Sequence, residues 1–215
     1  MTRLSLTLLP LLAFSLTTQA SNDSESLNLQ SHILAEAWGD LDKDGQPEKA
    51  LLLDVAIKGQ SPALRMIQIF KGSEDEWQLW HVSQGGVLDS ESGGLLGDPF
   101  ESMTIERGAL VIHHFGGSAQ KWNYTHRYRF DGKAWPLIGA TIKYGTQGCY
   151  QLFDYNLASG KAVHKQVSKQ CWSDDVLPST TTQLNIDKPK HHDLDSFTPG
   201  FNELTIKQLD TTIYY

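Results

Sequence analysis

The stretch WNYTHRYRF, Trp122–Phe130, decides the fold class that this sequence predicts. Aromatic rings or an imidazole recur at every second position, at residues 122, 124, 126, 128 and 130. Successive side chains point to opposite faces of a β-strand, so this spacing predicts a strand with one aromatic face. Asp131–Gly132 follows as a hairpin turn signal, and residues 135–144 form the expected returning strand.

The aromatic face of this strand allows two interpretations. Trp122, Tyr124, Tyr128 and Phe130 either pack in the core of the domain or, if the face is turned to solvent, form a platform that binds a sugar or a peptide. We adopt the first interpretation for the face and keep the second as its alternative.

Further strand-like segments lie on both sides of this hairpin. They are short, rich in β-branched and aromatic residues, and separated by turn clusters: residues 50–57, 64–70, 77–82, 102–106, 109–115, 149–156 and 161–167. Residues 83–100 instead form a long glycine-rich loop. No convincing helix and no internal repeat is visible, so we predict a single all-β domain, an antiparallel β-sandwich or meander.

Residues 1–20 have the pattern of a secretory signal peptide. Arg3 gives a positive start, residues 4–16 are mostly apolar, and small residues precede the expected cleavage after Ala20. The apolar run is short for a membrane span, and no later stretch is apolar enough to insert, so we expect a soluble mature protein, periplasmic or secreted, from a bacterium. The mature chain, residues 21–215, would form one β-rich domain, with its core at about 33–172 and a polar C-terminal extension at 173–215.

The net charge limits the classes of partner that we expect, and the cysteine count predicts the state of the thiols. Asp and Glu total 25 against 18 Lys and Arg, a formal net charge of −7, which argues against nucleic acid or anionic lipid as a partner. The cysteines of the chain, Cys149 and Cys171, form an even pair in a chain that we expect to be exported. We therefore expect them to form a disulfide.

The sharpest chemical feature is the acidic stretch GDLDKDGQPE, residues 39–48. Asp40, Asp42 and Asp44 can turn three carboxylates inward in a tight loop, and the glycine after the third permits a sharp turn. Calcium takes about six to eight oxygen ligands of this kind. The stretch is not an EF-hand, because the twelfth loop position, which would carry a bidentate Glu, is Leu51.

The acidic stretch resembles the calcium loop of FG-GAP and VCBS-type repeats, which reads D-x-D-x-D-G-x-x-D before a strand. The resemblance implies a structural calcium ion bound by Asp40, Asp42, Asp44, the backbone carbonyl of Gln46, and Glu48. The sequence departs from that pattern in carrying Glu48 where Asp is usual, and in having a single copy. The alternative is a turn whose carboxylates face water, although carboxylates held close together repel one another.

A second resemblance concerns the middle of the chain. GDPFES at residues 97–102, HFGGS at 114–118 and the aromatic hairpin at 122–139 are similar to segments of a group of uncharacterised exported bacterial proteins. These proteins also carry an acidic loop near the start of the domain. The similarity covers about residues 33–165. It implies one continuous domain and brings no known activity.

We therefore expect a calcium-stabilised, non-catalytic module that binds a protein, peptide or glycan. Its candidate binding residues lie in the glycine-rich loop and around the next turn: Asp98, Phe100, His114, Ser118 and Trp122. The alternative is a secreted hydrolase that uses Asp98, Glu101 and His114, which the absence of a nucleophile elbow, phosphate loop or zinc motif disfavours. A hydrolase should bring His114 and Asp98 together in one concave pocket, whereas a binding module should expose an aromatic or flat patch.

Overall fold

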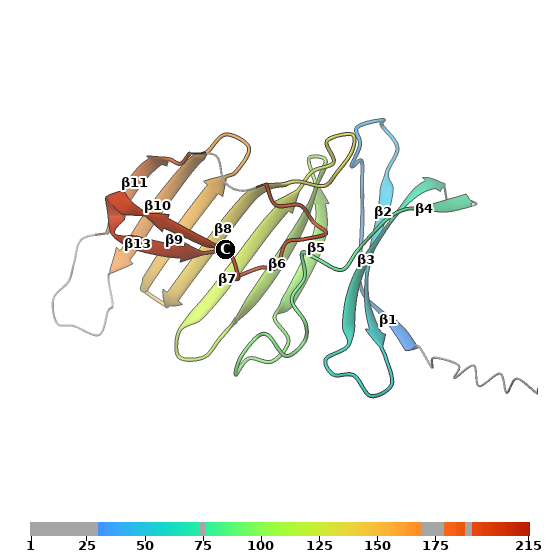
Figure 1. Ribbon diagram of the computed structural model, residues 1–215, viewed down its shortest axis with the longest axis horizontal. Helices are drawn as coiled ribbons and strands as arrows, with labels where there is room; N and C mark the ends of the chain where they lie inside the picture. Colours follow the sequence, from blue (N-terminus) through green and yellow to red (C-terminus); the bar gives the residue numbers. More distant parts are fainter. Residues whose placement is uncertain (1–29, 74–75, 169–178, 188–190) are drawn as a thin grey trace, which may run out of the picture.

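The computed structural model describes residues 30–73, 76–168, 179–187 and 191–215. The expected signal peptide at residues 1–20 and Cys171 lie outside the described residues. Within them, no helix has the length and apolar composition of a membrane span. The described chain forms antiparallel strands in a four-stranded sheet, a seven-stranded sheet and a two-stranded hairpin (Figure 1). This architecture confirms the all-β expectation.

The four-stranded sheet follows the chain order as a meander. It contains β1 (Gln30–Gly39), β2 (Glu48–Ala56), β3 (Leu64–Ser73) and β4 (Glu76–Ser83), each antiparallel to the next. Apolar side chains alternate along β2 and β3, and Ala50, Leu52, Ile67 and Ile69 are buried. Residues 40–47, the acidic loop, connect β1 to β2.

The seven-stranded sheet is a second meander (Figure 1). Its strands are β5 (Phe100–Glu106), β6 (Ala109–Gly117), β7 (Lys121–Tyr128), β8 (Leu137–Thr146), β9 (Cys149–Asn156), β10 (Lys161–Ser168) and β11 (Thr180–Asn185). The aromatic stretch forms β7, and the expected returning strand forms β8. The register pairs Trp122 with Tyr144 and Tyr124 with Ile142, so these side chains share one face of the sheet. β5 lies against β1, which brings the two sheets together.

The C-terminal residues cover one face of the seven-stranded sheet (Figure 1). Residues 191–202, the strap, lead into a hairpin made of β12 (Glu203–Ile206), the 3₁₀ turn η1 (Lys207–Leu209) and β13 (Thr211–Tyr214). The backbone amide of Leu194 donates to the Trp135 carbonyl at 2.9 Å, and the amide of Gly86 donates to the Phe197 carbonyl at 2.8 Å. The strap is therefore hydrogen-bonded both to the β7–β8 connection and to the chain that leaves β4.

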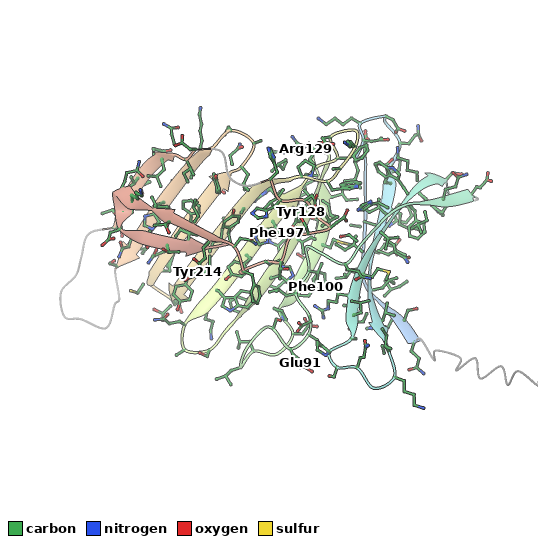
Figure 2. All side chains as sticks on the ribbon, viewed as in Figure 1. Glu91, Phe100, Tyr128, Arg129, Phe197 and Tyr214 are labelled. Atoms are coloured by element: carbon green, nitrogen blue, oxygen red, sulfur yellow. The ribbon has the colours of Figure 1, made fainter. Side chains whose placement is uncertain are left out.

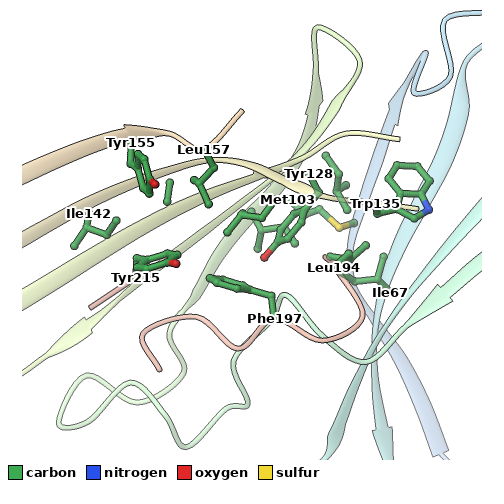
Figure 3. Packing of buried hydrophobic residues seen from close by; sticks show 14 of the residues in the cluster. Ile67, Met103, Tyr128, Trp135, Ile142, Tyr155, Leu157, Leu194, Phe197 and Tyr215 are labelled. Carbon is green, nitrogen blue, oxygen red and sulfur yellow. The ribbon is translucent and has the colours of Figure 1, made fainter. Parts of the chain in front are cut away.

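One hydrophobic core joins both sheets, the strap and the hairpin. Figure 3 shows Leu194, Phe197 and Tyr215 packed beside residues of the seven-stranded sheet, and each is at most 3% exposed. Ile206 and Ile213 of the hairpin belong to the same cluster. The core therefore extends well beyond the expected limit at residue 172. The apolar residues of the hairpin alternate in two short strands of four residues and stand among polar ones, which is why the sequence predicts only a polar extension there.

The cysteine of β9 marks one end of the predicted disulfide. Cys149 begins β9 and is not a free thiol. Its partner in the β9–β10 register is Ser168, the last residue of β10. Because Cys171 is outside the described residues, its pairing with Cys149 stays a prediction.

Candidate functional site

The acidic loop is folded by its own aspartates. The carboxylate oxygens of Asp40 accept hydrogen bonds from the backbone amides of Lys43 at 2.6 Å and Gly45 at 3.0 Å. Asp44 accepts a hydrogen bond from the backbone amide of Gln46 at 2.7 Å. Gly45 has a φ of 89°, a left-handed conformation that favours glycine. The loop is therefore a tight turn whose shape depends on its aspartates and its glycine.

Carboxylates of the loop and of β2 converge on one point. Asp40, Asp42 and Glu48 each offer an oxygen that lies within 4.8 Å of the other two. Glu48 is only 2% exposed, and its Oε2 accepts a hydrogen bond from the Leu41 backbone amide at 2.6 Å. Burial raises the pKa of Glu48, and the neighbouring charge of Asp42 acts in the same direction. Oxygen ligands of this type are the ones that Ca²⁺ takes.

A lysine from β3 faces this cluster. The Lys71 ammonium donates a hydrogen bond to Asp42 and lies 4.0 Å from the centroid of the Trp80 ring. This hydrogen bond lowers the pKa of Asp42 and raises the pKa of Lys71. Lys71 is distant from the loop in sequence and reaches it because β2 and β3 pair antiparallel, so no local motif predicts its presence.

The structure thus brings together part of the predicted metal site. Asp40, Asp42 and Glu48 converge. Asp44 and Gln46 are exposed instead, and the Asp44 carboxylate accepts a hydrogen bond from the Gln46 backbone amide. The converging oxygens fit a divalent cation in type and spacing. Within the described chain, the Lys71 ammonium contacts one of them, the Asp42 carboxylate.

Asp98, an exposed residue of the glycine-rich loop, pairs with a buried arginine. Its Oδ2 accepts a hydrogen bond from Arg65 Nη2 at 2.5 Å. Arg65 is 3% exposed, pairs through Nε with Asp54 at 3.1 Å, and donates through Nη1 to the Leu88 carbonyl at 2.9 Å. A buried guanidinium needs such partners, because an unpaired charge in the interior is costly. Asp98 therefore anchors its loop to β2 and β3.

His114 lies on β6 inside the core. It is 0% exposed, and its Nε2 accepts a hydrogen bond from the Leu88 backbone amide at 3.2 Å. Burial lowers the pKa of His114 to about 3. Glu101, at the start of β5, is exposed instead. The three residues of the alternative hydrolase, Asp98, Glu101 and His114, therefore do not meet in an open pocket.

The remaining candidate binding residues lie in different parts of the structure. Phe100 is half-buried near His114, with ring centroids 6.4 Å apart. Ser118 is exposed in the β6–β7 turn, and its amide donates to the Gln120 carbonyl at 2.8 Å. The Trp122 ring stacks on Tyr124 with centroids 4.7 Å apart and planes at 19°. Trp122 is the member of this set that borders a pocket.

A pocket opens between the seven-stranded sheet and the C-terminal hairpin, and we call it the aromatic pocket. Its volume is about 400 Å³, and its walls include Tyr124, Tyr144, Phe153 and Tyr214, with Gln151 and Thr212 among its polar groups. Tyr144 is 48% exposed and Tyr214 is 50% exposed. Figure 2 shows Tyr214 over the strands of the large sheet.

The aromatic face of β7 is divided between the core and this pocket. Tyr128 is 0% exposed and packs in the core, as expected from the first interpretation of the stretch. Tyr124 lines the pocket instead. Most other pocket residues escape local sequence reasoning. Gln151 and Phe153 lie near Tyr124 because β7, β8 and β9 are neighbours in the sheet. The local signal for them is their spacing of two residues, which places both side chains on the same face of β9.

Comparisons with known protein families, with curated proteins and with solved structures find no match to this chain. The likeness of the acidic loop to FG-GAP and VCBS-type calcium loops therefore stays a prediction. The function is inferred from the chain's own residues.

Proposed function

We propose that this chain is a non-catalytic binding module of the bacterial periplasm or secreted space, with the aromatic pocket as its ligand site. The observation that carries the proposal is the composition of the pocket: aromatic and aliphatic walls with neutral hydroxyl and amide groups. Ligand pockets typically have volumes of about 300–1,000 Å³, apolar and aromatic walls, and few polar groups. The aromatic pocket, at about 400 Å³, meets each criterion.

A hydrolytic function has less support in the same region. The aromatic pocket and two neighbouring pockets border β8 and β9, and these have no Asp, Glu or His among their described lining residues. Hydrolysis needs a nucleophile or an acid–base group within hydrogen-bond reach of the substrate. His114, the base of the alternative hydrolase, is enclosed in the core and has no access to a substrate.

We further propose that the acidic loop binds a structural calcium ion. The support is the convergence of Asp40, Asp42 and Glu48, whose oxygens would hold the ion. The Lys71 ammonium would then leave Asp42, because both cations use the same carboxylate. The bound ion would reduce the repulsion among the three carboxylates and tie the acidic loop to the start of β2. It would stabilise the module without contacting a ligand, because the aromatic pocket is built from other strands.

Retention of an unaltered ligand tests the binding function. The mature protein, residues 21–215, is immobilised and exposed to a soluble extract of bacterial cell envelope, and the eluted compounds are identified by mass spectrometry. We expect Tyr144→Ala to lose the retained compound. Tyr150→Ala is the matched control, since Tyr150 pairs with Gly145 and lies on the opposite face from Tyr144.

The same experiment can contradict the proposal in three ways. Compounds eluted with newly cleaved bonds would indicate catalysis. Equal retention by Tyr144→Ala and by the wild type would place the ligand elsewhere. No retained compound at all would leave the module without a ligand in its expected compartment.

A further inference from the structure

We infer that the ligand of the aromatic pocket is a neutral saccharide, an inference that rests on the proposed binding function. A saccharide ring has faces made largely of C–H groups and an edge made of hydroxyls. Such a molecule is complementary to aromatic walls that carry a few neutral hydrogen-bonding groups. The pocket provides this combination in its walls, its polar groups, its charge and its floor.

The aromatic walls come from both sides of the pocket. Tyr124 and Phe153 belong to β7 and β9 of the sheet, and Tyr214 belongs to the hairpin. Trp122 stacks behind Tyr124 with ring centroids 4.7 Å apart, which restricts the Tyr124 ring. A Cβ at Gly200 would lie 3.0 Å from Tyr124 Cε2, so the glycine lets the strap pass close to this ring. The Tyr124 ring is therefore held in position before a ligand binds.

Neutral polar groups in the pocket are free to bind hydroxyls. Gln151 uses its Oε1 with His164 Nε2 at 3.3 Å, and its amide N–H groups have no partner among residues that the structure describes. The Tyr124 hydroxyl likewise makes no hydrogen bond within this part of the chain. A sugar hydroxyl can both donate and accept, so it can satisfy an amide and a phenol together.

The described lining of the pocket is uncharged, which favours an uncharged ligand. This described lining contains no Asp, Glu, Lys, Arg or His. Burying a charge without a partner is costly. A sugar acid or an amino sugar would leave its charge unpaired in this pocket, whereas a neutral sugar would not.

The floor of the pocket offers an extended peptide no free sheet edge. Such peptides commonly bind by adding a strand to a free sheet edge, where main-chain groups are unpaired. β7, β8 and β9 are interior strands, and each is paired on both sides. Recognition at the floor therefore depends on side chains, which suits a compact ring better than an extended backbone.

Titration with small probes tests the ligand class. Cellobiose, maltose and diacetylchitobiose serve as neutral saccharides, glucuronic acid as a charged sugar, indole as an aromatic compound, and Gly-Tyr-Gly as a peptide. Isothermal titration calorimetry and tryptophan fluorescence of the mature protein report binding, since Trp122 stacks on a wall of the pocket. We expect at least one neutral disaccharide to bind.

Matched glutamine variants locate that binding. Gln151→Leu should weaken the affinity about fivefold, the effect of losing one neutral hydrogen bond. Gln147→Leu, in the exposed β8–β9 turn outside the aromatic pocket, should bind the saccharide as the wild type does. Equal affinity of Gln151→Leu and wild type would overturn the assignment of the saccharide to this pocket.

Which probes bind distinguishes the saccharide inference from the proposed binding function. If glucuronic acid, indole or the peptide binds and no neutral saccharide does, the ligand class is wrong and the binding function stands. If no probe binds at up to about 10 mM, where complexes with a Kd of about 1 mM would form, the saccharide inference is wrong. The retention experiment then decides the binding function alone. Cleavage of a disaccharide during titration would overturn both.

Discussion

His114 and His126 lie in the core with 0% of their surface exposed. Burial lowers the pKa of His114 to about 3 and lowers the pKa of His126 well below its ordinary value. Unfolding returns both imidazoles to a pKa of about 6.5. Below that pH the unfolded chain binds protons that the folded chain does not, so stability decreases as the pH falls. Well above pH 6.5 both side chains are uncharged in either state, and this penalty disappears.

We expect His126 to set part of this acid sensitivity. Each such histidine can lower the free energy of unfolding by up to about 1.4 kcal/mol per pH unit below about pH 6. His126→Phe, which keeps a ring between Tyr124 and Phe197, should flatten the dependence. Urea denaturation across this pH range measures it, with half-buried His113, changed to Phe, as the control. An unchanged slope in His126→Phe would contradict the role.

We expect Lys71 to determine how much a bound metal would stabilise the acidic loop. Lys71→Met leaves Asp40, Asp42 and Glu48 without the ammonium that contacts Asp42. We expect a loss of about 1 kcal/mol in chelator, because this pair is only partly buried. Calcium should restore the loss, since a ligand that binds only the folded state raises its stability. The wild type should gain less from calcium, because its ammonium must be displaced.

Thermal unfolding in chelator and in calcium measures these differences. Lys43→Met is the matched control, because Lys43 is an exposed lysine of the same loop. A melting temperature that is independent of calcium in both the wild type and Lys71→Met would count against a calcium site in the loop.

At the scale of elements, the strap packs one large aromatic ring into the core. Phe197 is 1% exposed, and its ring centroid lies 4.8 Å from that of His126 and 6.1 Å from that of Tyr128. Phe197→Ala should lower the free energy of unfolding by about 3–5 kcal/mol, because a buried ring leaves a cavity. Phe201→Ala, at a 76% exposed position of the same strap, should change it by less than about 0.5 kcal/mol. Similar losses in urea denaturation of both variants would contradict this role of the strap.

The β9–β10 hairpin is the element that the predicted disulfide would fasten. Cys149 opens β9, and Cys171 follows the end of β10 in the sequence. Reduction should destabilise the protein by about 3 kcal/mol, the value for closing a loop of this length in the chain-entropy account. Urea denaturation with and without reductant measures the loss, and Cys149→Ser/Cys171→Ser should be insensitive to reductant. Two alkylatable thiols in the protein purified without reductant, detected by mass spectrometry, would exclude the bond.

For the whole molecule, a feature can be predicted from the sequence when the residues that form it lie close together along the chain. Alternation within residues 122–130 predicts β7, and the aspartates with their glycine predict a tight loop, because both signals are local. Lys71 reaches the acidic loop because β2 pairs with β3, and Tyr214 reaches the aromatic pocket because the C-terminal hairpin packs over the large sheet. No local pattern in the sequence predicts either contact. His114 suits a binding site by residue type, yet burial removes it from solvent.

The two sheets should unfold as one unit. Trp80 of β4 contacts the rings of Phe130 and Trp135, with centroids 4.7 and 5.1 Å away, and Ser83 Oγ donates to the Leu194 carbonyl of the strap at 3.1 Å. Because these contacts and one core span both sheets, tryptophan fluorescence and far-ultraviolet circular dichroism should report one coincident urea transition. Leu194→Ala should move that transition to lower urea, by about 2–5 kcal/mol in free energy, since Leu194 is fully buried. Two separate transitions in the wild type would mean that the sheets are independent, and the strap would then stabilise only the sheet that it covers.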